Sequence, residues 1–172
     1  MLGVHRRVPS MTAQGPSDNA LAVVVAPNRE LSCKMSVALG KSCGPCTMCC
    51  KVLVIEELNK DAGILCGNCA IGGGCNIYQT RPQICRDYLC DWIMDRSLPP
   101  QLRPDRTGTI LQEDPESEEY QAVVDPKTPM AWRHPLVFKL LVAKAKEGKV
   151  VVAKAGLKTW RIFESGQVAP WT

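Results

Sequence analysis

The cysteines of this chain are concentrated in one short stretch. Nine of the ten lie within 48 residues, and six of these nine fall in two tight runs, CGPCTMCC and CGNC. The nine are Cys43, Cys46, Cys49, Cys50, Cys66, Cys69, Cys75, Cys85 and Cys90. A tight turn brings side chains i and i+3 to the same side, so two cysteines at this spacing can bind one metal ion, as in zinc and iron–sulfur sites. We therefore predict that all nine belong to a metal-binding cluster.

The type of ligand restricts the metal. Thiolates are soft ligands, and an all-sulfur set selects zinc or an iron–sulfur cluster over magnesium or calcium. The two histidines of the chain, His5 and His134, lie outside the cysteine-rich stretch. An all-cysteine zinc site is usually closed and structural. We therefore predict that a bound zinc ion is structural, with an iron–sulfur cluster as the alternative cofactor.

The adjacent pair Cys49–Cys50 restricts how the ligands can be grouped. Adjacent side chains generally diverge, so we expect the two sulfurs not to share one tetrahedral ion. In one arrangement, Cys43, Cys46 and one member of the pair join a distant cysteine at one metal, and the other member binds a second metal with the CGNC run. In the other arrangement, Cys43, Cys46 and Cys49 hold three corners of a four-iron cluster that has a remote fourth ligand.

Nine cysteines exceed the eight that two four-sulfur sites would use, so we expect one spare, with Cys50 and Cys66 as the candidates. The cysteines expected to behave as ligands are Cys43, Cys46, Cys75, Cys85 and Cys90. Cys49 is preferred to Cys50 because it completes the C-x2-C-x2-C spacing, and Cys69 is slightly preferred to Cys66. The outlying Cys33 is expected to be a free thiol or a small core residue.

The residues around the cysteines resemble a known family. The chain contains C-x2-C-x2-CC, then a glycine before C-x-I-Y, then R-P-x-x-C-R and a final cysteine. The matching residues are Cys43, Cys46, Cys49, Cys50, Cys75, Ile77, Tyr78, Arg81, Pro82, Cys85, Arg86 and Cys90. Over residues 41–93 the chain is similar to the cysteine-cluster proteins of the YkgJ type, described as zinc- or iron-chelating domains. This resemblance implies a metal-chelating cluster and no established reaction.

A more distant resemblance, to the cysteine motif of flagellin lysine N-methylases, implies an alternative. In that alternative the chain is an iron–sulfur protein that transfers electrons or supports a protein-modifying, methylase-like enzyme. The sequence contains no glycine-rich phosphate loop, no G-x-S-x-G and no dinucleotide fingerprint. We therefore predict no catalytic residue and a binding protein rather than an enzyme.

Four residues between the cysteines are expected to support the metal. Ile77 and Tyr78 are predicted to pack over the site and exclude water. Four thiolates on one Zn²⁺ leave a net charge of about −2, so nearby cations favour binding. Arg81 and Arg86 are placed to donate hydrogen bonds or to balance this charge.

The elements that position the cluster are predicted to be short, within an α+β fold. We expect a disordered leader at 1–19, an irregular metal-organised module at 20–98, and a small α+β unit at 99–172 that could form one compact domain with the module. The module is expected to contain a strand at 21–26, weak helical character at 30–42, an apolar run at 52–55 and a helical turn at 56–60. Pro82 is expected to open a short helix that carries Cys85 and Arg86 onward to Cys90. Prolines 99, 100 and 104 are read as a boundary.

The C-terminal unit is predicted to contain strands at 108–112, 120–124, 149–155 and 159–163, and one helix at 135–147. Pro135 suits the first turn of this helix, and Gly148 suits its end. The predicted core face of the helix consists of Leu136, Val137, Leu140, Leu141 and Ala143. Trp132 is expected to fill the core, and His134 could cap the helix.

Charge and hydropathy restrict the location and the partners. The net charge is +4, and the sequence has no segment of about 20 apolar residues and no well-flanked signal peptide. We therefore expect a cytoplasmic protein, in which a reducing environment favours cysteine ligands over disulfides. Residues 113–119 carry five acids, and residues 133–161 carry eight basic residues. We interpret the basic stretch as a solvated face, so we expect no nucleic acid and no membrane as partner, while a protein partner is possible.

Overall fold

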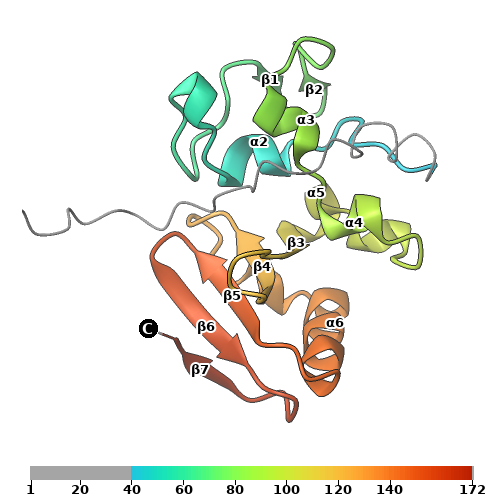
Figure 1. Cartoon of the computed structure of the whole chain (residues 1–172), viewed down its shortest axis with the longest axis vertical. Coiled ribbons are helices and arrows are strands. Elements are labelled where there is room, and N and C mark those ends of the chain that lie inside the picture. Colours follow the sequence, from blue (N-terminus) through green and yellow to red (C-terminus); the bar gives the residue numbers. More distant parts are fainter. Residues whose placement is uncertain (1–39, 172) are drawn as a thin grey trace, which may run out of the picture.

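The computed structural model describes residues 40–171, and it has both helices and strands, as predicted for an α+β fold. The expected leader, the strand at 21–26, nearly all of the weak helix at 30–42 and Cys33 lie outside the described residues. The strands β3 to β7 form one five-stranded sheet. The cysteine-rich segment lies next to the β3 edge of this sheet, and β7 lies at the opposite edge (Figure 1).

The strands of the sheet follow the order β3-β4-β5-β6-β7. They are β3 (Thr109–Glu113), β4 (Tyr120–Val124), β5 (Val151–Ala155), β6 (Lys158–Ile162) and β7 (Val168–Pro170). All neighbours are antiparallel except β4 and β5, which pair in parallel with Tyr120 opposite Val151. A parallel pair needs a long crossover, and here it contains η3 (Ala131–Arg133) and α6 (Pro135–Lys146). The four predicted strands and the helix are confirmed within two residues at their ends.

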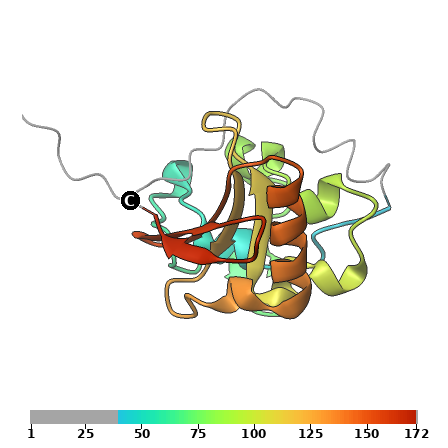
Figure 2. The same cartoon turned by 90° about the horizontal axis from the view of Figure 1, so that it is seen from below.

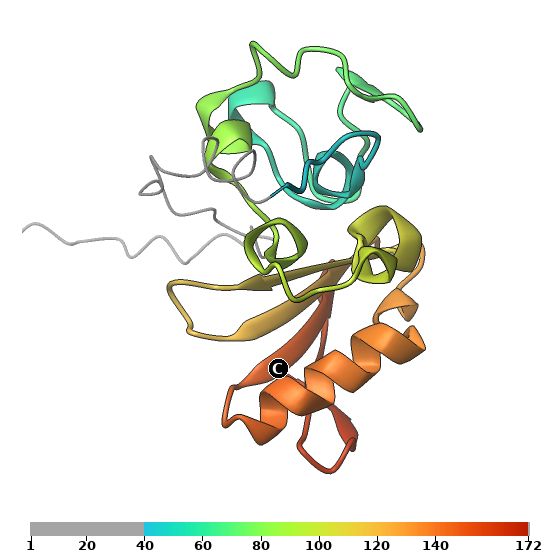
Figure 3. The same ribbon diagram turned by 90° about the vertical axis from the view of Figure 1, so that its right-hand side faces the viewer.

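Helix α6 lies along one face of the sheet (Figure 2), and the cysteine-rich segment lies on the other side (Figure 3). Val137 and Leu141 of α6 are fully buried, and Trp132 fills the core as predicted. Leu136 was expected in the core face, but it is 40% exposed. Consecutive helical residues are about 100° apart, so Leu136 points away from the stripe that Val137 and Leu141 form. His134 stands at the helix start, but its side chain makes no capping hydrogen bond.

Both faces of the two strands nearest the cysteines are covered, which explains why nearly every residue of β3 and β4 is buried. Ile110 and Val123 pack against Val52, the last residue of α2 (Met48–Val52), and against Leu53, which follows it. The alternate residues, with Leu111 among them, face the core that contains α6.

The segment between the cysteines and the sheet contains short helices that the sequence did not predict. They are α4 (Asp91–Met94), η2 (Pro100–Leu102) and α5 (Pro104–Thr107). Pro100 and Pro104 open the last two, where the missing N–H of proline costs no hydrogen bond. Trp92 and Ile93 of α4 belong to the core of the sheet. The core is therefore continuous across residue 98, and the division at that residue stays a prediction.

The acidic run joins β3 to β4 and pairs with lysines around the neighbouring strand β5. Lys149 lies 3.2 Å from Glu113, and Lys154 lies 3.1 Å from Glu119. Part of the basic stretch is therefore engaged in ion pairs within the fold. Within residues 40–171, no helix combines the length and the apolar character that crossing a membrane requires.

Candidate metal centre

The two C-x2-C runs fold as the predicted tight turns. The amide of Cys46 donates to the carbonyl of Cys43 at 2.9 Å, and the amide of Cys69 donates to the carbonyl of Cys66 at 3.0 Å. Each hydrogen bond spans three residues, so each turn brings its two cysteines close together. This local geometry is the one that the C-x2-C spacing predicts for a metal-binding pair.

The adjacent pair Cys49–Cys50 lies on α2, directly after the first turn. The two Sγ atoms are 4.0 Å apart. They diverge less than expected, because consecutive side chains are about 100° apart on a helix and point to opposite faces only on a strand. The carbonyl of Cys50 accepts a 2.9 Å hydrogen bond from the amide of Cys66, which fixes the second run against this helix.

A short hairpin of β1 (Cys69–Ala70) and β2 (Gly74–Cys75) presents the next cysteine. Cys69 and Cys75 are direct cross-strand partners, so their side chains share one face. Gly74 has a φ of +85°, and a Cβ at this position would lie 2.6 Å from the carbonyl oxygen of Gly44. The hairpin therefore packs against the CGPC turn at a distance that only glycine permits.

The last two cysteines lie on separate elements. Cys85 is on α3 (Gln83–Asp87), which Pro82 precedes, as predicted. The expected helix does not continue to Cys90, because Tyr88 is extended, and Cys90 instead begins α4. Lys41 donates hydrogen bonds to the carbonyls of Asp95 and Leu98, at 2.6 and 2.8 Å. These bonds fasten the segment before Cys43 to the loop that follows α4.

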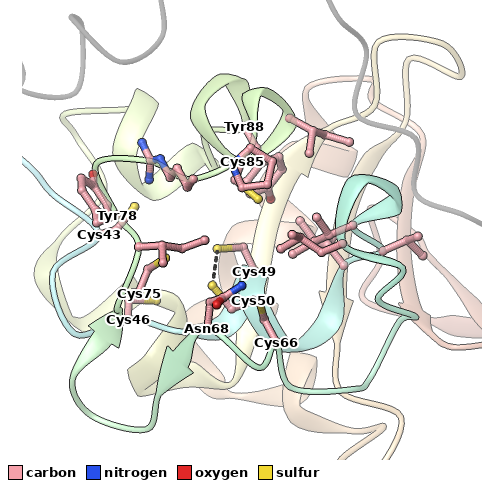
Figure 4. A pocket seen from close by; sticks show the side chains of 18 of the residues that line it. Cys43, Cys46, Cys49, Cys50, Cys66, Asn68, Cys75, Tyr78, Cys85 and Tyr88 are labelled. Carbon is pink, nitrogen blue, oxygen red and sulfur yellow. Dashed lines mark hydrogen bonds between the residues drawn. The ribbon is translucent and has the colours of Figure 1, made fainter.

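The cysteines surround two cavities, of about 60 Å³ and 40 Å³. The larger cavity is lined by Cys43, Cys46, Cys49, Cys50, Cys66, Cys75 and Cys85 (Figure 4). The smaller cavity is lined by Cys43, Cys46, Cys49, Cys85 and Cys90. Of the nine predicted ligands, only Cys69 lines neither cavity. In residues 40–171, no three ligand-type side chains converge at coordination geometry, so the fold gathers the thiols without closing them around one point.

Two cations are buried beside these thiols. Arg81 is 9% exposed, lies 4.0 Å from the Tyr78 ring centre, and forms a hydrogen bond with Cys43. Arg86 donates a 2.9 Å hydrogen bond to the carbonyl of Arg81 and so holds its backbone. Lys60 is 7% exposed and donates to the carbonyls of Lys51 and Leu53 at the end of α2. The sequence indicated the two arginines but gave no sign of Lys60, which stands in a polar, acidic segment that resembles a surface loop.

The environment separates the thiols by their pKa values. Burial raises the pKa of Cys85 to about 11, and the thiol of Cys50 adds to this effect. Burial likewise raises the pKa of Cys90 to about 12; a backbone hydrogen bond at Ile93 opposes the rise, and Cys43 and Cys46 add to it. The charges of other cysteines therefore act on both Cys85 and Cys90.

The half-buried Cys50 is the exception to this pattern. A hydrogen bond with Cys49 lowers the pKa of Cys50 to about 6, with further lowering by Cys69 and by the charges of Lys60 and Arg81 against the effect of burial. The thiolate form of Cys50, the form that binds metals, is therefore favoured near neutral pH.

The remaining walls of the larger cavity are mostly apolar. Ile77 and Tyr78 line it, as predicted, together with Leu53, Ile55 and Leu58. The last three come from the predicted apolar run and from the turn η1 (Glu56–Leu58). An apolar wall limits the access of water to the thiols, which suits a closed metal site.

Comparisons of the chain with protein-family models, with curated proteins and with solved structures found no match. The resemblance to the YkgJ-type proteins therefore stays a prediction.

Proposed function

We propose that this chain is a metal-binding protein whose cysteine cluster holds zinc or an iron–sulfur cluster, and that the metal organises residues 43–90. The observation that carries this proposal is the burial of Lys60, which is 7% exposed, among the cysteines. Burying a cation costs on the order of several kcal/mol of folding free energy unless a negative partner compensates the charge. Among the described residues, Lys60 pairs with no carboxylate, and the charges that act on it are those of cysteines, with Cys50 and Cys66 the strongest. Metal-bound thiolates would supply the missing negative charge.

The metal is proposed to have a structural role. The smaller of the two hydrophobic clusters contains four buried residues, and two of these, Ile110 and Val123, belong to the sheet. The cysteine-rich segment thus has little apolar core of its own, and metal binding can supply folding free energy to a segment of this kind. The nine cysteines of the described part are free thiols, which supports function in a reducing compartment, proposed to be the cytoplasm.

The direct test is elemental analysis and visible absorption of protein purified without oxygen. Zinc gives a colourless sample, and an iron–sulfur cluster gives a brown one. Removal of the metal by a chelator should then reduce helical circular dichroism and open residues 43–90 to protease, while the sheet stays protected. A chain purified without bound metal, or one whose circular dichroism and proteolysis do not change on chelation, would refute the proposal.

A change of Lys60 tests the charge argument separately. We expect Lys60→Met to lower metal affinity by about 10–100-fold, the range for groups that support metal ligands without binding the metal. Lys139→Met removes an exposed lysine from α6 and serves as the matched control. Competition with a chromogenic chelator measures both affinities. Equal affinities for the two variants would show that the buried ammonium only caps α2.

A further inference from the structure

The two cavities do not share all of their cysteines. Cys90 lines the smaller cavity alone. Three cysteines line the larger cavity alone, namely Cys50, Cys66 and Cys75. The remaining lining cysteines, Cys43, Cys46, Cys49 and Cys85, face both. The adjacent pair on α2 thus stands where the cavities meet, with Cys50 restricted to one of them.

The smaller cavity brings together the CGPC turn and the start of α4. Cys43 and Cys46 are the thiols whose charges act on Cys90. The bonds from Lys41 to the loop after α4 hold these two segments side by side. Cys49 lies three residues after Cys46; Cys50 acts on it most strongly, followed by Cys43 and Cys46. These four thiols are one complete set for a four-sulfur site.

The larger cavity brings together the other thiols. Cys50, Cys66 and Cys75 are the thiols whose charges act on Cys85. The hydrogen bond between the Cys66 amide and the Cys50 carbonyl fixes the first two against each other. The hairpin then places Cys75 on the same cavity wall as the CGPC turn, through the close approach of Gly74.

We infer that the chain holds two metal centres: one bound by Cys43, Cys46, Cys49 and Cys90, and one bound by Cys50, Cys66, Cys75 and Cys85. This inference rests on the proposed function and adds the number of centres and the ligands of each. Cys69 also hydrogen-bonds to the Cys50 thiol, and Cys50, Cys66 and Cys75 act on it as they do on Cys85. We assign Cys69 as the spare thiol because it is the one cysteine of the cluster that lines neither cavity. This choice reverses the slight preference for Cys69 over Cys66 that the sequence alone suggested.

The distance between the two adjacent sulfurs does not distinguish this inference from the alternative in which both bind one ion. Two sulfurs on one tetrahedral zinc ion lie about 3.8 Å apart, given Zn–S bonds of about 2.3 Å. The 4.0 Å between the Sγ atoms of Cys49 and Cys50 would therefore also allow both to bind one ion. Only the number of metals and their dependence on individual cysteines distinguish the two arrangements.

The test is the metal content of the full chain, measured by native mass spectrometry after loading with Zn²⁺ and after anaerobic purification. We expect two metal centres per chain in the unsubstituted protein. Cys90→Ser and Cys66→Ser should each keep one centre, and the double variant should keep none. Cys69→Ser, which changes the other cysteine of the same turn as Cys66, should keep both. Cys33→Ser, outside the described residues, is the control for the substitution itself.

Each outcome bears on a different claim. A chain that binds no metal refutes the proposed function together with the inference. A chain that binds a single centre keeps the proposed function and overturns the inference, and this result needs no variant to fold. Loss of a centre in Cys69→Ser, with two centres retained in Cys66→Ser, overturns the ligand assignment alone.

Discussion

Replacing Gly74 by alanine should separate the hairpin from the CGPC turn. The added Cβ would lie 2.6 Å from the carbonyl oxygen of Gly44, whereas ordinary contacts begin at 3.4 Å, so the two backbones must move apart by up to 0.8 Å (3.4 − 2.6). The positive φ of +85° adds about 1–2 kcal/mol of backbone strain for alanine. Overpacking of this kind costs a further 1–3 kcal/mol or so, about 2–5 kcal/mol in total.

Gly72 provides the matched control for this variant. It lies in the same hairpin with a φ of +75°, but a Cβ there meets nothing within 4 Å. Gly72→Ala should therefore cost only the backbone strain, about 1–2 kcal/mol. Urea unfolding of the metal-loaded proteins measures both values, and metal content shows whether Cys75 has been displaced. Equal destabilisation of the two variants, with full metal content in both, would refute the claim that close contact between hairpin and turn positions Cys75.

Two further predictions concern contacts between the cysteine-rich segment and the sheet. Lys51 lies 2.5 Å from the buried Asp125 carboxylate, and although burial alone would raise the pKa of Asp125, this contact holds it below its usual value. The contact therefore stabilises the protein above about pH 4, and this stabilisation is lost as pH falls through the lowered pKa of Asp125. Lys51→Met should lower the free energy of unfolding by only about 1 kcal/mol at pH 7, because the lysine is partly exposed and solvent screens its charge. The difference from the unsubstituted protein in urea midpoint should shrink toward pH 3, and a constant difference would contradict the ion-pair explanation. Tyr88→Phe removes a 2.7 Å hydrogen bond to the side-chain carbonyl of buried Gln112. This variant should lower the free energy of unfolding in urea by about 1–2 kcal/mol and leave the metal content unchanged. A loss of metal would instead indicate that the hydroxyl supports the metal site directly.

The sheet and its helix could be predicted because their signals are local. Helix α6 begins at Pro135 and is followed by Gly148 with a φ of +87°, as the positions of the two residues indicated. Strand β7 has no comparable signal, since it is three residues long and ends in Pro170 at the edge of the sheet. The short helix α4 is held by burial of Trp92 and Ile93 in the core, a tertiary effect that four residues of sequence cannot show.

That the cysteines lie close together could likewise be predicted from spacing, but their arrangement around the two cavities could not. Cys66 and Cys69 have the same C-x2-C spacing, and only the fold shows that one lines a cavity and the other does not. Lys60 is seven positions from Leu53 in sequence. An isolated β-bridge between Ile55 and Lys60 brings the ammonium of Lys60 back to the Leu53 carbonyl at the end of α2. Contacts of this kind arise from chain folding and leave no pattern in composition or periodicity.

The packing of α2 on the sheet has a consequence for the order in which the molecule is made. Val52 and Leu53 are covered by Ile110 and Val123, which are synthesised 58 (110 − 52) and 70 (123 − 53) residues later. All nine clustered cysteines are translated before the first strand of the sheet. On the proposal that the cluster binds metal, the growing chain can load it while the apolar side of α2 is still exposed, because shielding of that side waits for β3 and β4. A shortage of metal during translation would then leave this nascent segment both unfolded and uncovered, and we expect more of the protein to be lost to aggregation and proteolysis.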